Sequence, residues 1–284
     1  MSIFGDFFKK EAPLLGLQGS GGGLGFLTGS GRGITDEMPI LTTNASGTSA
    51  IGGVNDDLFA SSLQFAIPCG TSSGINLTDQ NPSGRTSALR NITNGGSLSG
   101  NTSISKYYGG SLYIQGGAQG SFSTNVWNSI GSGPFTVEMW VYLASSSMSE
   151  GYGSTIISCR GGGDNSTGWY SVGFGGIAGN VPKLFMNMSG GINHTISDDG
   201  SNAQFPSGVW THIAQTKDSS NNIRTYRNGI KIAQGNSSQS LNNVNRGLIG
   251  GHDYEAFGSF QSFYLNDIRI YNTAKYTGDS FTLF

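Results

Sequence analysis

The strongest constraint on the fold is a run near the end of the chain in which apolar stretches alternate with turn signals. Residues 208–234 read GVWTHIAQTKDSSNNIRTYRNGIKIAQ. We expect a polar loop at Asp218–Asn222 and three short strands, at Trp210–Thr216, Ile223–Arg227 and Ile230–Gln234. Asn228-Gly229 separates the last two strands and predicts a tight hairpin, because both turn positions need positive φ. The run therefore predicts an antiparallel meander.

Composition agrees with an all-β chain. Charged residues make up 11% of the sequence, against a usual share of ~25%. Glycine accounts for 47 of 284 residues, more than double the ordinary share of ~7%, as short strands with many turns require. The net charge of −2 offers no basic face, so no nucleic-acid partner is expected.

Further segments place the meander in a family. In chain order they are GPFTVEMWVY (133–142), TIIS (155–158), KLFMN (183–187), RGLIGG (246–251) and YLNDIRIYN (264–272). With the meander between the third and the fourth, this order resembles the laminin-G-like domain of the concanavalin A-like lectin/glucanase superfamily, over about residues 54–284. The resemblance implies an all-β fold, a two-sheet antiparallel sandwich of jelly-roll type.

The closing segment resembles one group of proteins within this superfamily. Residues 274–281 read AKYTGDSF, which is similar to copies of this domain in bacteriophage virion proteins, above all those of cyanophages. The resemblance implies a virion protein that is assembled in the host cytoplasm and exposed on the particle surface. Host surface glycan is then an expected partner.

The first 53 residues differ from the sandwich. Residues 1–33 mix bulky apolar residues with glycine, and so short and flexible a segment cannot bury its own side chains. We interpret residues 1–33 as an anchoring arm and residues 34–53 as a linker to the sandwich at 54–284. The expected anchor residues are Phe4, Phe7, Phe8, Leu14, Leu15, Leu17, Leu24, Phe26 and Leu27.

Three roles are open for the arm. Docking into another virion protein is favoured over intertwining with sibling chains, which would make a homo-oligomer. A membrane-active segment is the third, but Lys9 and Lys10 alone make a thin basic face. No apolar run approaches the ~18 residues of a membrane span, so no membrane partner is expected. Residues 1–10 place their charges after the apolar residues, the wrong order for a signal peptide, so no secretory signal is expected.

Catalysis has little support in the sequence. A glycosidase that retains the configuration of the sugar needs two carboxylates about 5–5.5 Å apart. The enzymes of this superfamily carry an E-x-D-x-(x)-E run on one strand. Glu138 is alone in its strand, and Asp253-Tyr-Glu255 is a pair that we place in a loop. The sequence therefore predicts no enzyme and no cofactor. Calcium is the alternative, held by loop carboxylates at Asp164, Asp253 and Glu255.

Two residue types are predicted to be structural. Cys69 and Cys159 are expected to be free buried thiols, with one disulfide as the alternative. His212 matches a histidine of the family's strand wording and is expected to pack within its strand rather than act as a base.

The aromatic residues divide into two groups. Trp140, Trp210, Phe135 and Tyr226 lie in expected strands and are assigned to the core. Glycine-rich loops hold the residues that could stack on sugar rings, although contact with neighbouring subunits or packing within the loops is the favoured use of such side chains. The candidates for glycan contact are Trp169, Tyr170, Tyr254 and Phe257.

The functional hypothesis is a non-enzymatic phage virion structural protein, anchored by its arm and displaying a lectin-like sandwich. A tail-associated appendage for host contact is favoured. A capsid decoration or cement protein is the alternative within the same class, and a glycan-cleaving enzyme is the alternative of another class.

Overall fold

The structure is a computed structural model, and it describes part of the chain. The described residues are 41–43, 49–51, 57–69, 90–93, 98–116, 118–123, 125–145, 155–160, 170–176, 182–188, 192–195, 205–241, 246–250 and 262–283. The chain divides into two units, residues 1–35 and 36–284, and all described residues belong to the second. The predicted arm therefore lies outside them. Within the predicted linker, β1 (Leu41–Thr43) and β2 (Ser49–Ile51) form a two-stranded antiparallel sheet.

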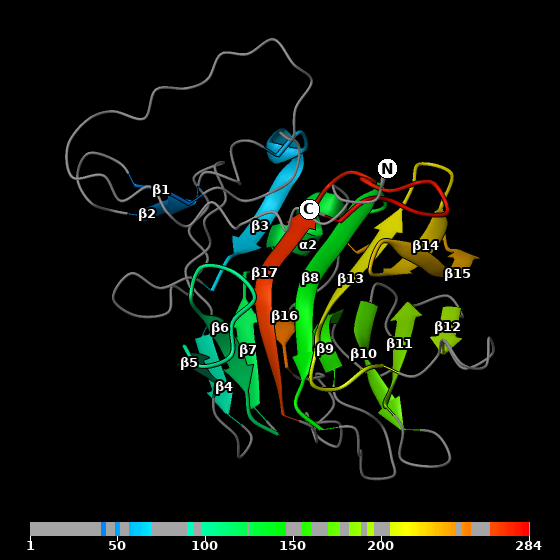
Figure 1. Cartoon of the computed structure of the whole chain (residues 1–284). Coiled ribbons are helices and arrows are strands. Elements are labelled where there is room, and N and C mark those ends of the chain that lie inside the picture. Colours follow the sequence, from blue (N-terminus) through cyan, green and yellow to red (C-terminus); the bar gives the residue numbers. More distant parts are fainter. Residues whose placement is uncertain are drawn as a thin grey trace, which may run out of the picture. The chain divides into compact units, whose positions relative to one another are not determined.

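Two larger antiparallel sheets make up the sandwich (Figure 1). The seven-stranded sheet has the order β12 (Ile192–Thr195), β11 (Pro182–Met188), β10 (Tyr170–Gly176), β9 (Thr155–Arg160), β16 (Arg246–Ile249), β7 (Ala118–Phe122) and β4 (Arg90–Thr93). The eight-stranded sheet has the order β15 (Ile230–Asn236), β14 (Asn222–Arg227), β13 (Trp210–Lys217), β8 (Phe135–Leu143), β17 (Phe263–Tyr271), β6 (Ser111–Ile114) and β5 (Leu98–Asn101), and β3 (Leu63–Ile67) also pairs with β17. The helical pieces within the described ranges are η1 (Ala60–Ser62) and α2 (Asn125–Ile130). The all-β, two-sheet prediction is confirmed.

The meander forms as the sequence predicts. Strands β13, β14 and β15 pair in succession and antiparallel, and Asn228 and Gly229 both have positive φ, 48° and 77°. Glycine is required at the second position, because a Cβ there would lie 2.3 Å from the carbonyl oxygen of Phe281. The amide of Phe281 donates to the carbonyl of Gly229, so this turn also holds the end of the chain.

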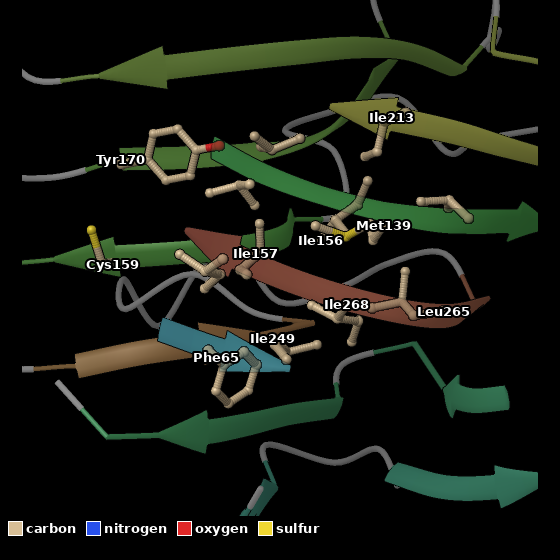
Figure 2. Packing of buried hydrophobic residues seen from close by; sticks show 14 of the residues in the cluster. Phe65, Met139, Ile156, Ile157, Cys159, Tyr170, Ile213, Ile249, Leu265 and Ile268 are labelled. Atoms are coloured by element: carbon tan, nitrogen blue, oxygen red, sulfur yellow. The ribbon is translucent and has the colours of Figure 1, made fainter. Parts of the chain in front are cut away.

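The main core lies between the two sheets. Side chains from β3, β8, β13 and β17 pack against side chains from β9, β10 and β16 (Figure 2). Met139, Ile213 and Leu265 are 1%, 3% and 0% exposed, as alternation along a strand requires for the face turned to the other sheet. Cys69 and Cys159 are free and buried, which confirms the prediction for both thiols.

The chain end covers part of the opposite face of the eight-stranded sheet, which we call the outer face. Tyr276 and Phe281 stack with ring centroids 3.6 Å apart, and both rings contact Tyr226. The hydroxyls of Thr216 and Tyr226 donate to the carbonyls of Tyr276 and Gly278, both at 2.8 Å. Tyr226 is thus buried as predicted, but beneath the C-terminal segment (residues 272–283) and not between the sheets.

Candidate functional site

Four aromatic side chains form one line across the outer face, and we call them the aromatic row: Tyr113, Tyr264, Tyr142 and Trp210. They come from four adjacent strands, and the register places Tyr264 opposite both Tyr113 and Tyr142, and Trp210 opposite Tyr142. Ring centroids are 4.8 Å apart for Tyr113–Tyr264, 5.8 Å for Tyr142–Tyr264 and 5.6 Å for Tyr142–Trp210. All four side chains are partly exposed.

Strand alternation explains why these rings face outward. Tyr264 lies between Phe263 and Leu265, which are both 0% exposed within the main core. Tyr113 lies between the equally buried Leu112 and Ile114. Successive side chains of a strand point to opposite faces. Since both neighbours of each tyrosine point into the main core, the tyrosine itself points to the outer face.

The row has the dimensions of a binding platform. Neighbouring strands lie about 4.8 Å apart, so four strands carry the rings over about 14 Å. A tyrosine or tryptophan offers an apolar face and a polar edge, and both stay useful at a wet surface. The rings are also supported from below by the main core, which limits their freedom. The platform is therefore extended, amphipathic and built on rigid strands.

A loop covers the part of the outer face that adjoins the aromatic row. We call residues 102–110 the covering loop, and its anchor is Asn266, which is fully buried. The Asn266 carboxamide donates to the carbonyls of Gly110 and Pro68 at 2.7 and 3.0 Å, and its oxygen accepts from the amide of Tyr107 at 3.0 Å. Behind the loop Trp140 is only 8% exposed. The covering loop thus forms one border of the aromatic row.

A cation lies in this border. The Lys106 ammonium is 4.1 Å from the ring centroid of Trp140 and 5.3 Å from that of Tyr107. Burial lowers the pKa of Lys106 from its ordinary value, yet the side chain remains partly exposed. The aromatic row therefore has a positive charge beside it.

Buried carboxylates lie further along the same sheet. The Lys275 ammonium is 2.7 Å from Glu138 Oε1 and 3.5 Å from Asp57 Oδ2, and Arg269 Nη1 is 3.2 Å from Asp57 Oδ2. Burial alone would raise the pKa of Glu138, but Lys275 above all lowers it to about 2. Both carboxylates are thus buried and paired with cations, which suits a structural role.

His212 belongs to this buried region. Its ring packs between those of Trp140 and Phe281, with centroids at 5.3 and 5.8 Å. Burial lowers its pKa to about 4, although the charge of Glu138 opposes the shift. The prediction that His212 is a packing residue is confirmed.

The structure corrects two assignments of aromatic residues. Tyr170 was a candidate for glycan contact, but it is 0% exposed and its hydroxyl donates to Gln215 inside the core, so a sugar has no access to it. Trp210 was assigned to the core, but it is partly exposed at the end of the aromatic row. The reason is register, because Ile213 turns to the core and residues at odd separation from it turn away.

The other predicted site residues lie outside the described part of the chain. They are the anchor residues Phe4 to Leu27, the glycan candidates Trp169, Tyr254 and Phe257, and the calcium candidates Asp164, Asp253 and Glu255. Among the described residues, no group of three or more histidine, cysteine or acidic side chains could hold a metal ion. No described helix has the length and apolar character to cross a membrane.

Comparison with known proteins identifies the fold family. The family model of the concanavalin A-like lectin/glucanases superfamily matches residues 109–277, more than half of the chain. No curated protein matches the sequence.

Solved structures share the fold at low identity. The binding domain of Paraclostridial Mosquitocidal Protein 1 gives a TM-score of 0.55 at 17% identity, over 77% of this chain and 50% of that chain. Domain 4 of AbnA, a GH43 extracellular arabinanase from Geobacillus stearothermophilus, in complex with arabinotriose, gives 0.51 at 15% identity, over 75% and 93%. The binding domain of botulinum neurotoxin serotype D/C gives 0.50 at 15% identity, over 78% and 50%. This chain spans about half the length of the two toxin domains.

Proposed function

The chain belongs to the concanavalin A-like lectin/glucanase superfamily, and we propose that it is a non-enzymatic binding module whose aromatic row holds a glycan. The observation that carries the proposal is the line of four partly exposed rings on adjacent strands. Sugar rings have an apolar face that stacks on such side chains, while their hydroxyls bond to water and to polar edges. A glycan chain lying across the strands would meet each ring in turn.

The buried carboxylates support a binding role over hydrolysis. Glu138 and Asp57 are 5% and 7% exposed, and each is paired with a cation. A glycosidase needs one protonated acid and one free carboxylate on either side of the bond that it cleaves. With its pKa lowered to about 2, Glu138 is ill suited to give a proton at neutral pH. The fold itself accommodates sugar in domain 4 of AbnA, which was solved with arabinotriose.

The setting of the module is a proposal from the sequence. We propose a bacteriophage virion protein, assembled in the host cytoplasm and exposed on the particle, in which residues 1–33 dock into other virion proteins. A tail-associated appendage for contact with host surface glycan is favoured, and a capsid decoration protein is the alternative. The supports are the closing segment AKYTGDSF and the apolar, glycine-rich arm.

The test of glycan binding has two stages. The full chain is first screened on a glycan array, and hits are measured by isothermal titration calorimetry. We then expect Tyr142→Ala and Tyr264→Ala each to weaken binding about tenfold, since a lost aromatic contact is worth roughly 1–1.5 kcal/mol. Near-UV circular dichroism reports whether the fold is retained.

A matched control lies on the same sheet. Ile230 is an apolar side chain that is 63% exposed on β15, outside the row. Ile230→Ala should bind glycan as the native chain does. If the row variants bind with native affinity, the proposed site is wrong. If they instead break up a dimer seen by analytical ultracentrifugation, the row is an interface between copies.

A further inference from the structure

The position of Lys106 bears on which glycan the aromatic row takes. Among the described residues, no carboxylate pairs with the Lys106 ammonium, which contacts the rings of Trp140 and Tyr107. Lys231 and Lys275, in contrast, each have an acidic partner. A partly exposed cation on aromatic rings, without a carboxylate, can accept an anion without first losing a protein partner.

The covering loop fixes where this cation lies. The Asn101 side-chain oxygen accepts from the amides of Ser103 and Ile104, at 3.0 and 2.8 Å, and so begins the loop with a tight turn. At the other end Tyr108 and Gly109 have φ of 61° and 70°, which bring the chain back to β6. Asn266 holds the middle. The position of Lys106 is thus set before a ligand arrives, which lowers the cost of binding.

The cation is within reach of a sugar on the row. The Lys106 ammonium lies over the ring of Trp140, and Tyr142 belongs to the row. Trp140 and Tyr142 are two residues apart on one face of β8. Such residues lie roughly 7 Å apart along a strand. A sugar stacked on Tyr142 and Tyr264 would therefore place a substituent of its ring edge near the ammonium.

We propose that the aromatic row and Lys106 form one site for an acidic oligosaccharide, whose rings stack on the row while a carboxylate or sulfate group pairs with Lys106. This inference rests on the proposed glycan-binding function and names its ligand class. Charge complementarity selects this occupant, because the chain carries a net charge of −2 and still presents a cation beside the aromatic row. Burial that disfavours the ammonium also favours an anion as its partner.

The experiment compares ligands that share one backbone. The probes are an oligogalacturonate, the same chain with its carboxyl groups reduced to hydroxymethyl groups, and that neutral chain after sulfation. Each is titrated calorimetrically into the full chain at two salt concentrations. We expect the neutral chain to bind more weakly than at least one anionic chain by roughly tenfold, as for a charge-assisted hydrogen bond, with the difference shrinking at high salt. The two anionic arms separate carboxylate from sulfate.

Variants assign the effect to Lys106. Lys106→Gln should lose the preference for the anionic chain and keep native affinity for the neutral one, while Lys106→Arg should keep the preference. Lys231→Gln is the control for net charge, because Lys231 lies on β15 and pairs with Asp279; it should leave the preference unchanged. Retained affinity for the neutral chain shows that Lys106→Gln is folded.

Each alternative result has a definite reading. Equal binding of neutral and anionic chains by the native protein overturns the acidic ligand and leaves the glycan site standing. A preference that survives Lys106→Gln overturns the role of Lys106. Absence of binding by all three probes, together with a glycan array without hits, overturns the proposed function itself. A row that is buried by a second copy in solution overturns both proposals.

Discussion

Replacing Lys275 by methionine tests the buried ion cluster on the outer face. Lys275 is 3% exposed and lies 2.7 Å from Glu138, which is 7% exposed as a side chain. Methionine keeps most of the length of the side chain and removes its charge. The substitution therefore leaves the Glu138 carboxylate buried without the cation that contributes most to its ionised state.

The magnitude follows from the pKa of Glu138. Folding lowers it from 4.5 to about 2, and this difference corresponds to about 3 kcal/mol of stability. Loss of one partner of a buried pair costs roughly 3–5 kcal/mol, so the two arguments agree. We expect Lys275→Met to lower the free energy of unfolding by about 3 kcal/mol at pH 7. Adding Glu138→Gln should recover most of this loss, because the amide needs no cation.

The pH dependence makes the test sharper. In the native chain the pKa of Glu138 is lower in the folded state, so its contribution is complete above pH 4.5 and is lost as pH falls through about 2. In Lys275→Met only the smaller effects of His212 and Arg269 still oppose burial. The pKa of Glu138 should therefore rise from its native value, and acid should cost the variant less stability than it costs the native chain. Urea unfolding followed by tryptophan fluorescence at pH 7, 4.5 and 3 measures both effects. A loss below 1 kcal/mol with an unchanged acid profile would refute the reasoning.

Four further outcomes are expected. His212→Phe should flatten the stability profile between pH 6.5 and about 4, because burial lowers the pKa of His212 to about 4 and the native chain loses that stability as pH falls through this range; guanidinium unfolding measures it. Gly229→Ala should lower the melting temperature more than Gly208→Ala, since both have positive φ but only the first places a Cβ 2.3 Å from Phe281. Trp210→Ala should cost roughly 1–2 kcal/mol by chemical unfolding, not the 3–5 kcal/mol of a buried tryptophan, and should weaken glycan binding. A chain that lacks residues 1–33 should melt as the full chain does and fail to join the virion, which particle proteomics would show; incorporation at native levels would contradict the anchoring role.

The sequence was most informative where structure is local. The meander depends on neighbouring residues: apolar alternation sets the strands, and Asn228-Gly229 sets the turn at positive φ. The ordered family segments added the two-sheet topology that local reasoning lacks. The core role of Phe135 also follows from strand alternation, and it is 0% exposed.

The aromatic row could not be read from local patterns alone. Each of its three tyrosines is a single aromatic between buried neighbours, and Trp210 is the first residue of β13. Only the pairing of β6, β17, β8 and β13 brings the four together. Alternation along the strands did indicate part of the row. Tyr142 and Trp140 are two residues apart and so share one face of their strand, as do Trp210 and His212. That face separates them from the core positions Val141 and Ile213. The expectation that loops carry the ligand and strands only the core hid this indication.

The ion cluster was missed for a related reason. Asp57 precedes the sandwich strands, while Glu138 and Lys275 lie in β8 and the C-terminal segment, so no spacing in the sequence links them. The structure joins them because the C-terminal segment folds back over the outer face. Long-range contacts of this kind depend on topology. The family resemblance predicted the topology, but it did not indicate which charged residues the topology brings together.

The division of the outer face explains how one fold can carry different ligands. The C-terminal segment covers Tyr226 and Ala214 on this face, and the covering loop covers Trp140. The aromatic row remains partly exposed beside them. The strands that hold the row are required by the core, but the outward residues are not, since their replacement leaves the inner face intact. Structures that share this sandwich at 15–17% identity are therefore free to differ at those positions. Under the proposed function, ligand specificity lies in Tyr113, Tyr142, Trp210, Tyr264 and Lys106. The substitutions of Tyr142, Trp210, Tyr264 and Lys106 described above test this while the core stays unchanged.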